Sequence, residues 1–120
     1  MAARKRLICA AAELVDGGKG AVFETEHGGR TVPAFAVRFR GAVYAYLNRC
    51  AHVAMELDWR PGEFFDQTGL YLICATHGAM YVPETGACAG GPCRGGALIS
   101  LQLHEEDGKV FLIEDRFEGG

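Results

Sequence analysis

The sequence predicts a small all-β domain, an antiparallel sandwich or barrel built from short strands. Apolar residues recur at every second position, turn signals rich in glycine separate these runs, and no segment carries a long amphipathic helical pattern. Seventeen glycines in 120 residues agree with a chain that turns often. The length fits a single domain over residues 1–120, without an internal repeat or a linker.

The clearest alternation lies in two consecutive segments, 31–41 (TVPAFAVRFRG) and 42–48 (AVYAYLN). The alternating apolar positions are Phe35, Val37 and Phe39 in the first and Val43, Ala45 and Leu47 in the second, with Ala36, Arg38, Arg40, Tyr44 and Tyr46 on the opposite faces. Alternation of this kind is typical of half-buried antiparallel strands.

A third alternating segment, 98–104 (LISLQLH), is followed by a strong hairpin signal, Asp107-Gly108, and then by the apolar segment 109–114. Near the N-terminus, residues 7–12 are expected to form a strand, and residues 12–17 (AELVDG) to add one helical turn. Further turn signals lie at 16–18, 27–29, 40–41 and 85–86.

Two long segments without periodicity, about 48–68 and 75–96, interrupt this pattern. Such long loops in a compact domain are usually functional or disordered, and the Cys, His, Gly, Pro and aromatic residues here favour function. The first loop carries Cys50 and His52, and the second begins at Cys74 and His77, after an expected strand over 70–73. Each loop therefore offers one thiolate and one imidazole, close to a strand end.

The chemistry of these ligands favours a cluster over a single ion. Thiolates suit zinc or iron–sulfur centres, and imidazole is compatible with both. Structural zinc sites with mixed ligands usually pair Cys with Cys and His with His at short spacing, so Cys-x-His is unusual for zinc. Two irons bridged by sulfide remove this conflict, because one iron takes both cysteines and the other both histidines. A zinc-stabilised structural or binding module remains the alternative.

The pattern CAH…CATHG followed by TGACAGGP resembles the Rieske [2Fe–2S] domain, in its ferredoxin form. The resemblance implies a Rieske-like β fold with a cluster-binding subdomain formed by the two loops, and one [2Fe–2S] cluster per subunit. It also implies that Cys50 and Cys74 bind the inner iron, while His52 and His77 bind the outer iron. Gly78 matches the family's glycine after the second histidine, and Gly91-Pro92 its proline loop over the cluster.

The sequence departs from the family's high-potential members in three places. The spacer between His52 and Cys74 has 21 residues, a few more than is common. The first loop has Val53-Ala54-Met55 and the second has Thr76 where those members carry a pair of disulfide-forming cysteines. Ala79 replaces their serine, although their tyrosine is matched by Tyr81. With fewer hydrogen bonds to the cluster, we expect a potential low in the Rieske range of roughly −150 to +300 mV.

The sequence predicts an electron carrier and not a complete enzyme. We find neither a second metal site of His and carboxylate residues nor a glycine-rich nucleotide-binding fingerprint. The resemblance implies a flavin-dependent reductase as electron donor, and an oxygenase or other oxidoreductase as acceptor. An accessory subunit of a larger oxidoreductase, such as a nitrite reductase, or a redox sensor is the alternative.

Charge and cysteine content limit the partners and the location. A formal net charge of −3 provides no basic surface for nucleic acid or anionic lipid. The basic residues 4–6 precede an apolar stretch that ends at Glu13, too short for a signal peptide or a membrane span. Five cysteines, an odd number, argue against a disulfide scaffold, so we expect a cytoplasmic protein.

The remaining reactive or aromatic residues have simpler interpretations. We interpret Cys88 and Cys93, in the segment CAGGPC, as ordinary small apolar residues, with extra ligands or a local disulfide as alternatives. Cys9 is expected in the core, and His27 and His104 in solvent. Trp59, Phe64 and Phe65 are expected to pack, although an exposed aromatic near the site could anchor a partner. Residues 105–107 are expected to form a solvated turn.

Overall fold

The computed structural model of the protein describes residues 3–49, 57–58, 62–74, 78–93 and 95–115. Within these ranges the strands form antiparallel pairs, which confirms the predicted all-β class. The strands are β1 (Ala3–Ala10), β2 (Ala21–His27), β3 (Arg30–Phe39), β4 (Ala42–Leu47), β5 (Leu72–Ile73), β6 (Met80–Tyr81), β7 (Cys88–Gly90), β8 (Ser100–Leu101), β9 (Leu103–Glu106) and β10 (Lys109–Asp115).

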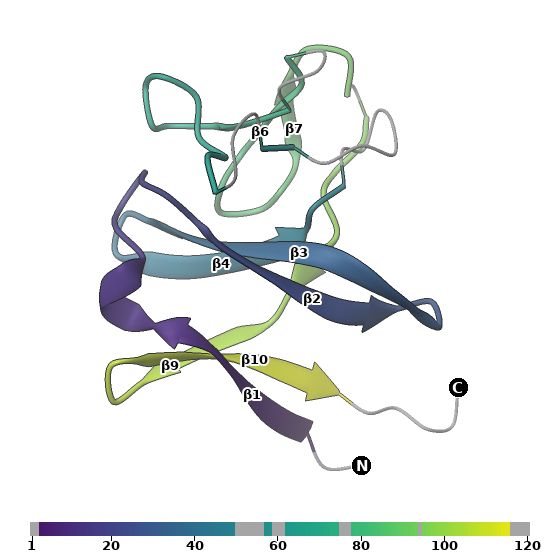
Figure 1. Ribbon diagram of the computed structural model, residues 1–120. Helices are drawn as coiled ribbons and strands as arrows, with labels where there is room; N and C mark the ends of the chain where they lie inside the picture. Colours follow the sequence, from purple (N-terminus) through teal and green to yellow (C-terminus); the bar gives the residue numbers. More distant parts are fainter. Residues whose placement is uncertain (1–2, 50–56, 59–61, 75–77, 94, 116–120) are drawn as a thin grey trace.

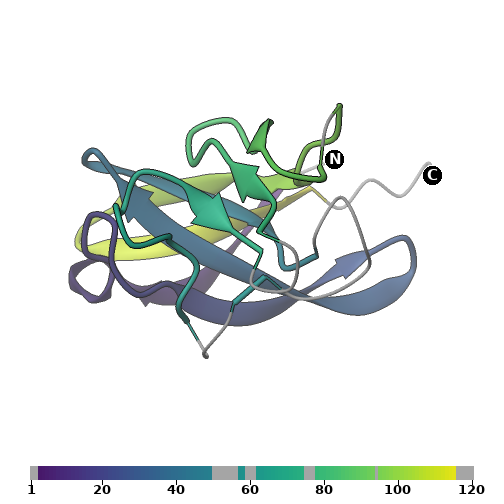
Figure 2. The same cartoon turned by 90° about the horizontal axis from the view of Figure 1, so that it is seen from above.

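These strands form three sheets arranged as layers. The lower sheet has the order β1-β10-β9, the central sheet β2-β3-β4-β8, and the small sheet β5-β6-β7. Figure 1 shows the central sheet between the other two, and Figure 2, seen from above, shows the small sheet lying across it. The second non-periodic segment of the sequence, about 75–96, contributes β6 and β7 and is therefore less irregular than expected.

The central sheet separates two apolar clusters, because successive side chains of a strand point to opposite faces. Phe35, Val37 and Phe39 of β3 face the small sheet, together with Tyr46 of β4. Ala36 packs in the other cluster, toward the lower sheet. The predicted alternation is therefore confirmed, but these strands are buried on both faces and not half-buried. The small sheet covers the Phe35 face of β3, and the lower sheet covers the Ala36 face, which the sequence pattern leaves to solvent.

The segment 98–104 was expected to form a single strand, and the structure divides it at Gln102. Before this residue β8 pairs with β4 of the central sheet, and after it β9 pairs with β10 of the lower sheet. The carbonyl oxygen of Gln102 accepts a hydrogen bond from the Ile113 backbone N–H at 2.9 Å. The chain changes sheets here without losing its alternation, so Leu101 and Leu103 both pack in the lower apolar cluster.

The predicted hairpin at Asp107-Gly108 is confirmed. Glu106 and Lys109 pair across it, and the two turn residues have φ angles of 52° and 72°. Positive φ at both central positions is the geometry that matches the right-handed twist of the flanking strands, and glycine adopts it without steric cost. The signals at 27–29 and 40–41 form equivalent hairpins, between β2 and β3 and between β3 and β4.

The first strand begins earlier than expected, and a 3-10 turn over Ala11–Glu13 replaces the predicted helical turn over 12–17. Cys9, on this strand, is 8% exposed and packs in the lower apolar cluster, as expected for a core residue. Its burial raises the pKa of the thiol. This cysteine therefore fills space in the lower part of the molecule, remote in sequence from both loops.

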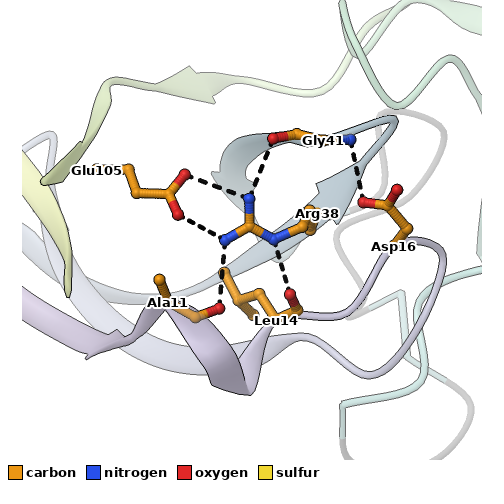
Figure 3. Close-up of polar contacts among 6 residues, drawn as sticks. All are labelled: Ala11, Leu14, Asp16, Arg38, Gly41 and Glu105. Carbon is orange, nitrogen blue, oxygen red and sulfur yellow. Dashed lines mark hydrogen bonds and ion pairs between the residues drawn. The ribbon is translucent and has the colours of Figure 1, made fainter. Parts of the chain in front are cut away.

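One arginine joins the central sheet to the chain on its lower side (Figure 3). The Arg38 guanidinium donates two hydrogen bonds to the Glu105 carboxylate, at 2.8 and 3.2 Å. It also donates to three backbone carbonyl oxygens, those of Ala11, Leu14 and Gly41. This ion pair lowers the pKa of Glu105 and raises that of Arg38. We call this group the Arg38 latch.

The Arg38 latch changes the interpretation of residues 105–107, which were expected to form a simple solvated turn. The Glu105 side chain is 34% exposed and is engaged by Arg38, while Glu106 accepts a hydrogen bond from the Lys5 ammonium at 2.7 Å. Both carboxylates therefore connect β9 to other strands. Sequence patterns do not reveal these pairs because the partners lie 67 and 101 residues away in the chain.

Candidate metal centre

Cys74 is the predicted ligand that the structure describes. It follows β5 directly, as the sequence suggested, although that strand covers only Leu72–Ile73 instead of residues 70–73. Its side chain is fully buried in the upper apolar cluster, with Ala79 and Cys93 among the members of the same cluster. The rigid end of a strand thus fixes the position of this thiol.

Two backbone hydrogen bonds close the start of the second loop. The Cys74 N–H donates to the Ala79 carbonyl oxygen at 2.8 Å, and the Gly78 N–H donates to the Cys74 carbonyl oxygen at 2.9 Å. These bonds join Cys74 to Gly78 and Ala79, across the segment 75–77 that contains His77. Gly78 has a φ of 73°, a left-handed conformation that favours glycine. This explains why a glycine follows the expected ligand His77.

The other expected ligands, Cys50, His52 and His77, lie outside the described residues, as does Trp59. Among the residues that the structure describes, no three His, Cys, Asp or Glu side chains gather as a metal site. Since three of the four expected ligands are not among them, the ligand set as a whole stays a prediction.

The base of the first loop is held by a polar group that the sequence analysis missed. Asn48 directly follows β4 and is only 3% exposed. Its side-chain oxygen accepts a hydrogen bond from the Leu57 N–H at 2.7 Å, and its amide nitrogen donates to Asp58 at 3.1 Å. The other Asp58 oxygen accepts from the Gly62 N–H at 3.2 Å. We call these four residues the Asn48 clasp.

The Asn48 clasp joins the two sides of the segment that carries Cys50 and His52. Leu57, beside Asp58, is fully buried in the upper apolar cluster and anchors the returning chain. The sequence signal for this clasp was an asparagine at the end of a predicted strand and two residues before the expected ligand Cys50. Its partners could not be found from spacing, because they follow the loop that it closes.

The Gly91-Pro92 turn lies against the second loop. Gly91 has a φ of 82°, and a Cβ atom on it would stand 2.8 Å from the Gly78 carbonyl oxygen and 3.0 Å from the Ala79 Cα. Pairing of Gly90 with Met80 between β7 and β6 aligns the two segments. The backbone of this turn therefore touches the segment that begins at Cys74. Its coverage of a cluster stays a prediction.

Cys88 and Cys93 form a disulfide, with their Cα atoms 5.6 Å apart. The interpretation of both as unlinked small apolar residues was therefore wrong. The physical reason is that the turn after β7 reverses the chain and brings the two residues to the separation that a disulfide requires. Part of that interpretation survives, since Cys93 is 3% exposed and packs in the upper apolar cluster, with Cys88 partly buried against it.

Phe64 and Phe65, the two described phenylalanines of the first loop, pack as expected. Phe64 is fully buried and stacks on Phe35, with ring centroids 3.9 Å apart. Phe65 is 7% exposed and stacks on Phe39. Neither is available as a docking anchor, because both rings lie between the small sheet and the central sheet.

The two histidines outside the loops are exposed, as predicted. His27 lies at the end of β2 beside a hairpin turn. His104 lies on β9, and its Nε2 atom is 3.0 Å from a carboxylate oxygen of Glu106. Both histidines belong to the sheets beneath the small sheet and not to its loops.

The surroundings of Cys74 fit an iron–sulfur cluster. A thiolate in a fully buried apolar position is unfavourable unless a cation compensates its charge. Thiolate is also the ligand that iron–sulfur clusters and other soft centres prefer. The tight start of the second loop and the close approach of Gly91 bring backbone from two segments to the residues beside this thiol.

The fold and the site define the class of a small antiparallel β domain with a fully buried cysteine, Cys74, at the start of a loop. The model of the Rieske [2Fe-2S] domain family matches residues 5–114. The chain belongs to this family, and its cofactor is a [2Fe–2S] cluster.

Solved structures with the same fold include ferredoxins. The chain is similar to a chain in the complex of reduced oxygenase and oxidized ferredoxin in carbazole 1,9a-dioxygenase, with 23% identity, a TM-score of 0.70, and coverage of 95% of this chain and 97% of that one. It is also similar to the Sphingomonas yanoikuyae B1 ferredoxin, with 21% identity, a TM-score of 0.71, and coverage of 93% and 100%.

A third similar structure is the ferredoxin of carbazole 1,9a-dioxygenase from Nocardioides aromaticivorans IC177, with 20% identity, a TM-score of 0.69, and coverage of 92% and 98%. At these identities the likeness concerns the fold. No curated protein sequence matches the chain. Among the described residues, no helix has the length and apolar character needed to cross a membrane.

Proposed function

We propose that the protein is a one-electron carrier whose [2Fe–2S] cluster is held by Cys50, His52, Cys74 and His77. The observation that carries the proposal is the Rieske family match over residues 5–114, which takes in nearly all of the described fold. The bound cluster supplies the chemistry, which is reversible uptake of one electron. The residues of the chain hold the cluster, shield it and leave one side open to a partner.

In this proposal the cysteine and histidine ligands bind different irons and differ in burial and in charge. Cys50 and Cys74 hold the inner iron, and the complete burial of Cys74 supports this assignment. His52 and His77 hold the outer iron, and neutral imidazole adds no negative charge there. The reduced state is then penalised less than with four thiolates, which raises the potential above that of all-cysteine ferredoxins.

Within the Rieske range we propose a low potential. Ala79 is fully buried and has no hydroxyl group to donate toward a cluster sulfide. Tyr81, which matches the family's tyrosine, is also fully buried. Hydrogen bonds to the sulfurs stabilise the reduced cluster, so the missing hydroxyl lowers the potential.

We further propose that the partners are redox proteins, a flavin-dependent reductase as donor and an oxygenase or other oxidoreductase as acceptor. The ferredoxin neighbour seen in complex with the oxygenase of carbazole 1,9a-dioxygenase supports the second half of this assignment. Contacts between such partners are usually small and transient. We place the protein in the cytoplasm, acting as a carrier and not as a catalyst.

Metal and sulfide analysis tests this function. Protein purified without oxygen is expected to hold two irons and two acid-labile sulfides per chain and to show the electron paramagnetic resonance signal of a reduced cluster with histidine ligands. A colourless protein with one zinc would contradict the proposal. A stable co-purifying subunit would indicate the accessory role instead of a free carrier.

Replacing one histidine tests the ligand set. In His77→Ala the outer iron loses one of its two protein ligands, so we expect the native cluster signal to disappear. The matched control is His104→Ala, which removes an exposed histidine from β9 and should leave the signal unchanged. An unchanged signal in His77→Ala would refute the assignment of this ligand.

A further inference from the structure

The segment from Cys88 to Gly96 is closed on itself by one covalent bond and two backbone hydrogen bonds. The disulfide joins Cys88 to Cys93. The Cys88 N–H donates to the Gly96 carbonyl oxygen at 3.1 Å, and the Gly96 N–H donates to the Cys93 carbonyl oxygen at 2.7 Å. The Gly91-Pro92 turn lies inside the disulfide-bonded ring, so the disulfide restricts the positions that the turn can take.

This turn is in direct backbone contact with the second loop. A Cβ atom on Gly91 would lie 2.8 Å from the Gly78 carbonyl oxygen, a separation that real Cβ atoms essentially never show. Gly78 and Ala79 are in turn hydrogen-bonded to the backbone of Cys74. A displacement of the turn is therefore transmitted through one contact and one hydrogen bond to the residue that bears the thiol.

We propose that the Cys88–Cys93 disulfide is a reversible positioning cross-link for the cluster site. Closed, it holds the Gly91-Pro92 turn against the second loop; opened by a dithiol, it releases the turn and shortens the lifetime of the cluster. The inference rests on the proposed function for its cluster readouts. It differs from the disulfide that the family's high-potential members carry, because it joins the two sides of the Gly91-Pro92 turn and does not join one ligand loop to the other.

The burial of the two sulfurs determines how a dithiol opens this bond. Cys88 is partly buried and Cys93 is 3% exposed, so a thiolate of the dithiol attacks the Cys88 Sγ. The S–S bond breaks, and Cys93 leaves as a thiolate that takes up a proton. The second thiol of the dithiol then attacks its own mixed-disulfide sulfur and releases Cys88 as a thiol. The dithiol supplies both electrons and both protons, and the cluster supplies none.

The open state has suitable surroundings for the buried thiol. The Cys93 Sγ lies 3.2 Å from the Gly90 carbonyl oxygen and 3.5 Å from the Met80 carbonyl oxygen. A protonated Cys93 could donate to one of these acceptors without moving, so its burial would leave no unsatisfied donor. The site therefore suits the disulfide and the thiol alike, and this is the property that a reversible cross-link needs.

The test compares the double variant Cys88→Ser/Cys93→Ser with wild type, before and after incubation with dithiothreitol. Loss of a short covalent ring increases the freedom of the turn, so we expect the half-life of the cluster under air to fall roughly tenfold. We also expect a shifted reduction potential and faster hydrogen exchange of the amides at 78–80. Reduced wild type should match the variant, and reoxidation should restore the original values. Thiol counting on the denatured protein verifies the state of the disulfide.

Two further variants separate the disulfide from other effects. Cys9→Ala removes a buried cysteine beneath the central sheet and should change none of these readouts. Gly91→Ala places a Cβ 2.8 Å from the Gly78 carbonyl oxygen, closer than a normal contact. This variant should therefore loosen the turn even with the disulfide closed. Unchanged cluster lifetime and potential in the double variant and in reduced wild type would overturn the proposal.

Failure of the proposed function is distinguishable from failure of this inference. If wild type binds no iron or sulfide, the carrier function is wrong. Hydrogen exchange at 78–80 with the disulfide open and closed then still decides whether Cys88–Cys93 positions the second loop. Equal exchange in the two states would overturn the cross-link, and faster exchange in the open state would support it.

Discussion

The lower two layers of the molecule and its upper layer are stabilised in different ways. In the lower and central sheets, strands of up to ten residues pair along their length, and two-residue hairpins set the register. The small sheet has strands of two or three residues, too short to be stable by pairing alone. Side-chain links replace pairing there: the Asn48 clasp, the disulfide and two stacked aromatic pairs.

This difference indicates how loops can hold a redox site in a fixed position. The regular sheets provide a stable base, and a few specific contacts fix each loop to it. Local stability follows the density of buried contacts and protected hydrogen bonds, so we expect the small sheet to open more readily than the central sheet. Variants at single contacts should reveal which of these links matters most.

The largest effect is expected where the two regions meet. Phe64→Ala removes a fully buried ring stacked on Phe35, so the free energy of unfolding should fall by about 3–5 kcal/mol. Chemical denaturation followed by circular dichroism measures this change. The control Val22→Ala, at an exposed position on β2, should stay within about 0.5 kcal/mol of wild type. A comparably small loss in Phe64→Ala would mean that the stack does not join the regions.

A smaller and more local effect is expected at the Asn48 clasp. Asn48→Ala leaves the Leu57 N–H and the Asp58 carboxylate without this partner, at a cost of about 1–3 kcal/mol. Hydrogen exchange should become faster at Leu57 and Gly62 and stay unchanged in β9 and β10. Asp58→Asn, which removes one acceptor and keeps the side-chain volume, should give an intermediate result. Equal hydrogen exchange at Leu57 and Gly62 in wild type and Asn48→Ala would contradict the proposed clasp.

The smallest effect is expected at the Arg38 latch, in the lower region. Glu105→Gln removes the charge from a partly exposed pair and should lower the free energy of unfolding at pH 7 by about 1–2 kcal/mol. Folding lowers the pKa of Glu105, so the pair stabilises the protein above the ordinary glutamate pKa of about 4.3. This contribution disappears as the pH falls through the folded pKa.

The pH dependence provides the control for this prediction. Wild type should lose stability in acid more steeply than Glu105→Gln, as followed by thermal unfolding between pH 7 and pH values below about 4. Glu106→Gln removes only the carboxylate that pairs with Lys5 and His104 at the surface. It should change the acid slope less than Glu105→Gln does. Parallel acid slopes for wild type and Glu105→Gln would count against the latch.

Much of the lower region could be predicted from the sequence. Alternation in β3 and β4 identified which side chains share a face, and Asp107-Gly108 located a hairpin, because both signals are local. The division at Gln102 could not be predicted, since the alternation of Leu101 and Leu103 continues through the change of sheet. Burial of both faces of β3 was missed because the lower sheet, which covers the Ala36 face, is built from strands far from β3 in the sequence.

At the site, the types and spacing of residues were enough to predict the family, while the supporting contacts were not predictable. Strands of two residues, such as β5 and β6, are too short to show a period. The partners of Asn48 follow the loop that it closes, and pairing of Cys88 with Cys93 depends on a turn whose shape the sequence does not specify. Long-range pairs of this kind become visible only in three dimensions.

The pairing of Ala3 with Asp115 at one end of the lower sheet has a practical consequence. Figure 1 shows the lower sheet, to which this pair belongs, on the side of the central sheet away from the small sheet. A linker or immobilisation handle added at either end would therefore attach to the base of the molecule. Anchored to an electrode in this way, the protein would present its upper face to the surrounding solution, where exchange with dissolved partners could be followed directly by voltammetry.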